Sequence, residues 1–182
     1  MTDRACAARR VHDRACAALR ALGADPELIE RRGLPLFDDA SELTVAHVSA
    51  SGREHFLVRE AAGAWIAMRA AAEADGVTLL MISGFRSFEH QLELVRARVE
   101  RGEDIDEVLA VLAPPGCSEH HSGRAVDVGT PGSEPLSERF EETEAFRWLR
   151  EHAAEHAFSL SFPRGNPYRY LYEPWHWCWH AP

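Results

Sequence analysis

Two stretches of the sequence concentrate imidazole and carboxylate side chains. The first reads SEHHSGRAVD and contains His120 and Asp127, and the second reads EPWHWC and contains Glu173 and His176. Neutral imidazole nitrogen and carboxylate oxygen are good ligands for Zn²⁺ at about 2.0–2.2 Å. A catalytic zinc takes three protein ligands and leaves one position open for water. Together the two stretches therefore offer enough donors for a zinc site that activates water.

The spacing within each stretch constrains how such a site could form. His120 and Asp127 are an odd number of positions apart, which would place them on opposite faces of a straight strand. Gly123, between them, offers a bend that could bring both to one metal. Glu173 and His176 are also an odd number apart, and the proline between them suits an edge or irregular strand. Spacing is compatible with a single metal but does not by itself establish one.

Three motifs resemble the VanY-type D-alanyl-D-alanine carboxypeptidases, with the related D-Ala-D-Ala dipeptidases and L-alanyl-D-glutamate endolysins. The family pattern S-x-H-x-x-G-x-A-x-D is followed later by E-P-W-H and preceded by S-G-[YF]-R-S-x-x-x-Q. In this chain the three motifs span residues 118–127, 173–176 and 83–91. They occur in the family's order, and the resemblance covers about residues 56–179.

The resemblance implies a role for each motif residue. The implied ligands of one Zn²⁺ per chain are His120, Asp127 and His176. Glu173 is expected to be the general base that accepts a proton from the attacking water. Arg86 is expected to face the scissile carbonyl and stabilise the oxyanion, for which its permanent charge and planar fork are suited. Ser118 and Gln91 are expected to line the substrate cleft.

Apolar periodicity and breakers predict a mixed chain. Helices are expected at residues 3–22, 57–75, 87–100, 104–112 and 142–158, strands at 78–83 and 124–128, and an extended segment at 171–179. The resemblance implies an α+β fold, Hedgehog/DD-peptidase-like, with a small antiparallel sheet flanked by helices. We expect residues 1–55 to be an N-terminal helical extension packed on a catalytic domain of residues 56–182.

Composition excludes several classes of function. The 182 residues carry a net charge of −9, so nucleic acid is not an expected partner. All 20 basic residues are Arg, which excludes a Schiff-base lysine and a Walker-type phosphate loop. No apolar run is long enough to span a membrane, and no secretory leader is visible at the N-terminus. The compartment stays open: cytoplasmic as the sequence stands, or the cell envelope if a leader was removed.

Other interpretations of the site residues compete with these. Asp127 could cap a turn, Glu173 could be a surface acid, and Arg86 could pair with Glu89. The segment HAAEH from His152 to His156 matches H-x-x-E-H, the inverted zinc-peptidase motif.

The cysteines next to the two motifs leave a further choice open. If the motif segments pair as strands, Cys117 and Cys178 could approach and form a disulfide. Two free, buried thiols are the default interpretation.

We therefore expect a zinc peptidase that acts on peptidoglycan stem peptides and releases terminal D-Ala. The alternatives are an L,D-carboxypeptidase, an L-alanyl-D-glutamate endopeptidase, or a zinc-stabilised binding module without turnover. A binding module would need neither Glu173 nor Arg86, so their presence favours an enzyme. The sequence does not indicate the oligomeric state.

Overall fold

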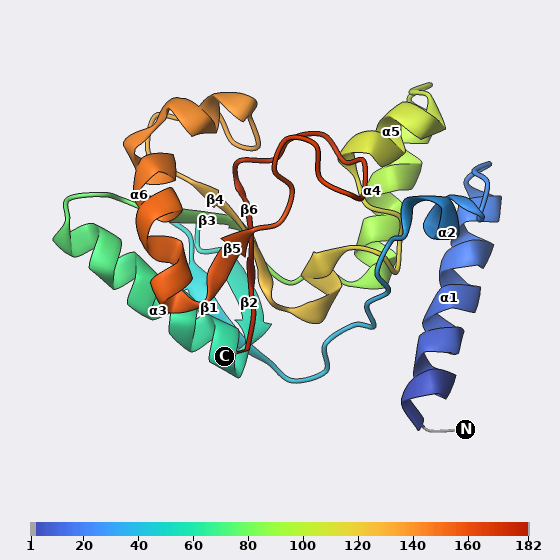
Figure 1. The fold of residues 1–182 in the computed structure, drawn as a ribbon, viewed down its shortest axis with the longest axis horizontal. Helices are drawn as coiled ribbons and strands as arrows, with labels where there is room; N and C mark the ends of the chain where they lie inside the picture. The colour runs from blue at the N-terminus through green and yellow to red at the C-terminus, as the bar shows by residue number, and fades with distance from the viewer. Residues whose placement is uncertain (1–2, 182) are drawn as a thin grey trace.

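The computed structural model describes residues 3–181, with the strands at the centre and helices on either side (Figure 1). The α-helices are α1 (Asp3–Ala21), α2 (Leu28–Arg32), α3 (Arg59–Ala74), α4 (Phe88–Glu100), α5 (Ile105–Val111) and α6 (Glu144–His152). The 3₁₀ turns are η1 (Glu119–Ser122), η2 (Glu138–Glu142) and η3 (Ala153–His156). The strands are β1 (Leu43–Val48), β2 (Glu54–Val58), β3 (Leu80–Ser83), β4 (Ala125–Gly129), β5 (Phe158–Leu160) and β6 (His176–Trp179).

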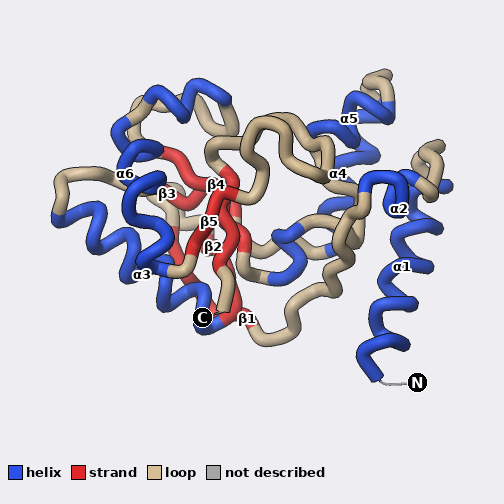
Figure 2. Tube along the Cα trace, in the orientation of Figure 1, coloured by secondary structure: helices blue, strands red, loops and turns tan. Residues whose placement is uncertain are grey.

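The strands form two antiparallel sheets (Figure 2). A four-stranded sheet has the order β3-β4-β6-β5, and β1 pairs with β2 in a separate hairpin. Both central strands, β4 and β6, are buried at every residue. Their alternate side chains nevertheless differ in chemistry, because the two faces of the sheet meet different surroundings.

One face of the four-stranded sheet packs on the larger hydrophobic core. Val126 and Val128 of β4 and Trp177 and Trp179 of β6 lie in this cluster with residues of α3 and α6. The side chains between them along the strands point to the other face, where Asp127 and His176 lie. The polar residues of the central strands are therefore placed on the face away from this core.

A second hydrophobic cluster joins the N-terminal helices to the remainder of the chain. Ala15 and Leu19 of α1 pack with Val95 of α4 and Leu109 of α5, and the cluster continues to Tyr170. In Figure 1 the helices α1, α2, α4 and α5 lie together, on the opposite side of the strands from α3 and α6. The functional residues described below lie at the junction of the two clusters.

The expected α+β class, a small antiparallel sheet flanked by helices, is confirmed. The helix expected over 142–158 is shorter, because α6 ends at His152 and continues as η3. The hairpin β1–β2 was not predicted, so the segment 1–55 holds a strand as well as α1 and α2. None of the described helices is long and apolar enough to cross a membrane.

Candidate active site

Three candidate metal ligands meet at the polar face of the four-stranded sheet. Asp127 and His176 are register partners on β4 and β6, and His120 comes from η1. The Asp127 carboxylate lies between the rings: Oδ1 is 3.1 Å from His176 Nδ1, and Oδ2 is 3.2 Å from His120 Nε2. One donor atom from each of these three residues lies within 4.8 Å of the other two, which is close enough for all three to bind one metal ion. Among residues 3–181, this is the group of acidic, His and Cys side chains that could hold a metal.

Two glycines explain how His120 and Asp127 reach the same point although they are an odd number of positions apart in the sequence. Gly123, which ends η1, has a φ of 65°, a left-handed conformation that turns the chain back into β4. Gly84 lies so close to β2 that an added Cβ would be 2.8 Å from the Phe56 carbonyl oxygen. This approach leaves the Gly84 carbonyl 2.7 Å from His120 Nδ1, so the ring donates there and turns Nε2 toward Asp127.

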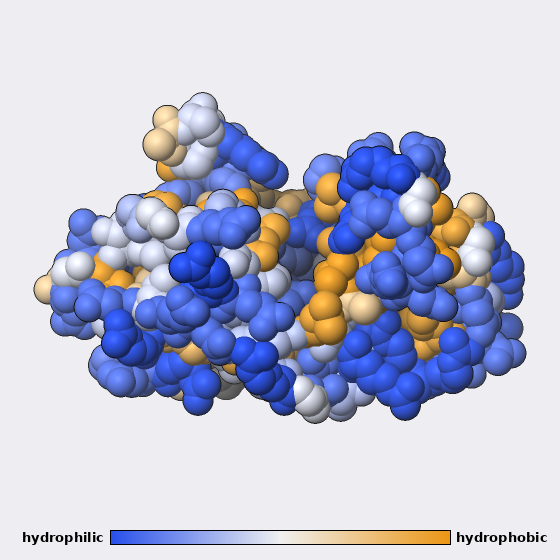
Figure 3. All heavy atoms as spheres, turned by 90° about the horizontal axis from the view of Figure 1, so that it is seen from above, coloured by the Kyte–Doolittle hydropathy of each residue, from blue (hydrophilic) through white to orange (hydrophobic). Residues whose placement is uncertain are grey.

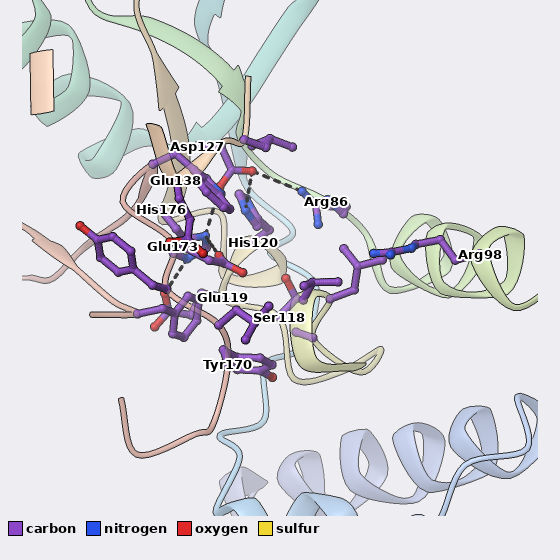
Figure 4. Close-up of a pocket in the computed structure, with 18 residues that line it drawn as sticks. Arg86, Arg98, Ser118, Glu119, His120, Asp127, Glu138, Tyr170, Glu173 and His176 are labelled. Atoms are coloured by element: carbon purple, nitrogen blue, oxygen red, sulfur yellow. Dashed lines mark hydrogen bonds and ion pairs between the residues drawn. The ribbon is translucent and has the colours of Figure 1, made fainter. Parts of the chain in front are cut away.

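His176 is held from both sides. Its Nδ1 faces Asp127, and its Nε2 is 2.9 Å from Glu119 Oε2 (Figure 4). Although burial by itself would lower it, the hydrogen bonds to Asp127 and Glu119 raise the pKa of His176 to about 10. The two carboxylates therefore favour a cation at this ring, either a proton or a metal ion.

Asp127 stays ionised and His120 stays neutral in this pocket. Burial alone would raise the pKa of Asp127, but its close contacts with the His120 and His176 rings hold it far below its usual range. Burial lowers the pKa of His120. An anionic carboxylate and a neutral imidazole are the protonation states that metal coordination requires.

Glu173 is the carboxylate available for proton transfer. Its Oε2 lies 3.7 Å from His176 Nδ1, which is the nitrogen that faces Asp127. Burial raises the pKa of Glu173 to about 7, and a bound dication nearby would lower it again. A buried carboxylate beside the three metal ligands is therefore placed to serve as a general base.

Arg86 is clamped beside the same centre. Nη1 is 2.8 Å from Gln91 Oε1, Nη2 is 3.2 Å from Ser83 Oγ, and Nη2 also lies 3.5 Å from Asp127 Oδ2. Glu89, the alternative partner, pairs with Arg14 instead. Because two neutral acceptors orient the guanidinium, its remaining donors have a set direction.

Gln91 was expected to line the substrate cleft, but the structure places it behind the cavity wall. It is fully buried, and its amide donates to the Ala113 carbonyl at 2.7 Å while its oxygen accepts from Arg86. It lies behind Arg86 and is not among the residues that line the cavity. The structure therefore gives Gln91 contacts that orient Arg86, whereas Ser118 does line the cavity.

A cavity of about 440 Å³ opens over these residues, which is within the usual size of small-ligand sites. Its walls combine Arg86, Glu119 and Glu173 with the aromatic rings of Phe162 and Tyr170. In the view from above, Figure 3 shows a hollow between the two halves of the molecule, bordered by hydrophobic side chains. Two exposed leucines, Leu136 and Leu171, belong to this lining.

Other interpretations of the sequence find no support in the structure. Asp127 lies within β4 and not at a turn. The helix α6 ends at His152, so His152 and His156 do not share one α-helical face, and His152 pairs with Glu155 instead. Cys117 and Cys178 are both free and buried.

Sequence reasoning missed Glu119 and Ser161. Glu119 occupies the unspecified position of S-x-H, and Ser161 lies outside all three motifs. The sequence offered one signal for Glu119, because this acid directly precedes the predicted metal ligand His120.

The sequence model of the VanY family, described as D-alanyl-D-alanine carboxypeptidase, matches residues 54–182. The chain belongs to the VanY family. YodJ of Bacillus subtilis (strain 168), which is named as a carboxypeptidase, is 31% identical over 151 residues. That match covers 79% of this chain and 55% of YodJ, so the chain spans about half the length of this relative.

Solved structures of VanY relatives share the fold. The LdcB LD-carboxypeptidase is 30% identical with a TM-score of 0.69, over 78% of this chain and 69% of LdcB. A VanY mutant from a VanB-type vancomycin resistance cassette, solved in complex with Zn(II), is 25% identical with a TM-score of 0.63. That match covers 82% of this chain and 89% of the VanY chain. The metal in that VanY structure agrees with the donor set found here.

Proposed function

We propose that this protein is a zinc-dependent carboxypeptidase that removes the terminal D-Ala from peptidoglycan stem peptides. The observation that carries the proposal is the convergence of His120, Asp127 and His176 beneath a cavity that also presents Glu173 and Arg86. A bound zinc would supply Lewis-acid activation of water, whose pKa falls to about 7 on such a metal.

The protein's own residues account for the remaining steps. Glu173 accepts a proton from the attacking water as the water oxygen bonds to the peptide carbonyl carbon. Arg86 faces the carbonyl oxygen and stabilises the negative charge that develops on it. Glu173 then returns the proton to the leaving amine as the C–N bond breaks, so the base is regenerated. The rings of Phe162 and Tyr170 form an apolar part of the cavity wall beside these residues.

A second candidate reaction would use the same centre on a different terminal bond of the stem peptide. The similarity to the LdcB LD-carboxypeptidase favours removal of D-Ala that follows an L-configured centre. An L-alanyl-D-glutamate endopeptidase would use the same centre on an internal bond of the same stem.

Mass spectrometry of defined stem peptides separates these reactions. The zinc-loaded protein is incubated with a pentapeptide ending in D-Ala-D-Ala and with the tetrapeptide lacking the last residue. Loss of one alanine from the pentapeptide supports the proposal, and loss of one alanine from the tetrapeptide alone supports the L,D-reaction. Cleavage after the first alanine would indicate the endopeptidase. A protein that binds zinc but cleaves neither peptide would contradict an enzymatic function.

A further inference from the structure

The two imidazole ligands of the candidate zinc site are oriented by unlike acceptors. His120 donates from Nδ1 to the backbone carbonyl of Gly84 at 2.7 Å. His176 Nε2 lies 2.9 Å from the carboxylate oxygen Oε2 of Glu119, on the side of the ring away from Asp127 (Figure 4). A neutral main-chain group therefore holds one ring, and a charged side chain holds the other.

We propose that Glu119 is a positioning residue of the metal centre. Its carboxylate accepts the Nε2 proton of His176 and thereby leaves the Nδ1 lone pair directed at the metal. The inference rests on the zinc site of the proposed function. A ligand histidine whose second nitrogen donates to a carboxylate is held in one tautomer and becomes a more basic ligand.

Glu119 is itself held in place. Ser161 Oγ donates to the same oxygen, Oε2, at 2.6 Å. Ser161 directly follows β5, whereas Glu119 begins η1 and immediately precedes His120. One carboxylate thus links the segment that carries His120 to β6, which carries His176. The Glu119 side chain is 14% exposed, so its charge is little screened by solvent.

These contacts also distinguish Glu119 from Glu173. Oε2 of Glu119 already accepts from Ser161 and His176, so it is poorly placed to take a proton from water. Within the described residues, no hydrogen bond engages the Glu173 carboxylate, which lies 3.7 Å from the metal-facing Nδ1. The structure therefore separates two adjacent acids into one that orients a ligand and one that is free for chemistry.

Zinc affinity measured by competition with a chromogenic chelator tests the proposal on the full-length protein. Glu119→Ala should weaken zinc binding by about 10–100-fold, the usual effect of losing such a partner. Glu119→Gln keeps an acceptor of similar shape without the charge and should fall between this variant and the parent. Ser161→Ala should have a smaller effect, because the contact with His176 survives.

The matched control is Glu138→Gln. Glu138 also lines the cavity, but it pairs with the exposed Arg164 and not with a ligand. The same loss of charge there should leave zinc affinity unchanged.

The absorption spectrum of the Co²⁺-substituted protein gives a readout of ligand geometry that does not depend on turnover. Glu119→Gln should shift the visible bands relative to the parent, and Glu138→Gln should not. If Glu119→Ala does not fold, the zinc affinity and the Co²⁺ spectrum of Glu119→Gln together test the proposal.

The positioning role is overturned if Glu119→Gln, and Glu119→Ala where it folds, match the parent in zinc affinity and spectrum. That result would leave hydrolysis by the parent intact. Conversely, a parent that binds zinc but cleaves no stem peptide would contradict the proposed function alone. The two failures are thus distinguishable.

Discussion

Asp127 and His176 face each other across the antiparallel strands β4 and β6, with Oδ1 3.1 Å from Nδ1. They are separated by 49 positions in the chain, and the strand register is what brings them together. The neighbours of each, Val126 and Trp177, point to the opposite face and lie in the larger core. The same alternation that buries the core therefore aims the two ligands at a metal.

Replacement of Glu173 should separate metal binding from catalysis. Glu173→Gln keeps the size of the side chain but cannot accept the proton, so kcat should fall by about 10²–10⁴-fold while zinc content is unchanged. Peptide hydrolysis and metal analysis of the purified variant check this. Glu142→Gln, which changes an exposed acid outside the cavity, should retain the parent rate. An unchanged kcat in Glu173→Gln would remove Glu173 from the mechanism.

Removal of zinc should abolish activity and reduce stability. A ligand present at 100 times its Kd stabilises the folded state by about 2.7 kcal/mol, so chelation should lower Tm and added zinc should restore it. His176→Ala should show neither activity nor the zinc-dependent rise in Tm. His152→Ala, in the H-x-x-E-H segment, should behave as the parent does. Loss of zinc from the His152 variant instead would show that the metal lies elsewhere.

The contribution of Arg86 to kcat should depend on both the charge and the planar shape of its guanidinium group. Arg86→Ala should lower kcat by about 10²–10³-fold, the typical effect of losing an oxyanion donor. Arg86→Lys keeps the charge but cannot reproduce the contacts with Gln91 and Ser83, so it should remain well below the parent. Gln91→Leu should have a smaller effect, because the Gln91 side chain hydrogen-bonds to Arg86 and the Ala113 carbonyl and does not line the cavity. Equal kcat values for Arg86→Lys and the parent would show that the oriented guanidinium group is not required for catalysis.

The hairpin histidines should make the fold sensitive to acid. His47 and His55 are register partners on β1 and β2, and burial lowers the pKa of both. The unfolded chain then binds more protons than the folded one below about pH 6.5, so the free energy of unfolding decreases as pH falls from there. Chemical denaturation between pH 8 and about pH 5 measures the slope.

The double variant His47→Gln, His55→Gln should flatten this decline. The exposed His90→Gln is the control and should leave it unchanged. An equal slope in the double variant and the parent would show that other groups cause the acid sensitivity.

Arg32, at the end of α2, links the N-terminal helices to the wall of the cavity, and its loss should affect both stability and substrate binding. Its guanidinium donates to the carbonyl oxygens of Tyr168 at 2.6 Å and Leu109 at 2.8 Å, and it lies over the Tyr170 ring. Arg32→Ala should reduce the free energy of unfolding by about 2–3 kcal/mol, because charged hydrogen bonds are lost and carbonyls are left unpaired. KM should rise as well, since Tyr170 lines the cavity. The exposed neighbour Arg31, replaced by Ala, should change stability by less than about 0.5 kcal/mol.

Local chemistry alone predicted much of this protein. The motif residues identified the donor types for zinc, and Gly123 marked the turn between His120 and β4. Periodicity also located α3 and α4 closely, because each carries an apolar stripe with the helical period, and α5 lies within the helix predicted at residues 104–112. The division at residue 56 stays a prediction.

Only the tertiary structure decided how the candidate site is supported. The contacts of Glu119 with His176 and Ser161 join segments 57 and 42 positions apart, and Gln91 lies behind Arg86 and not in the cleft. Residue type and spacing describe what a side chain can do within its own strand or helix. Which groups face each other across strands depends on register and on the packing of the two cores, and these arise from the whole chain at once.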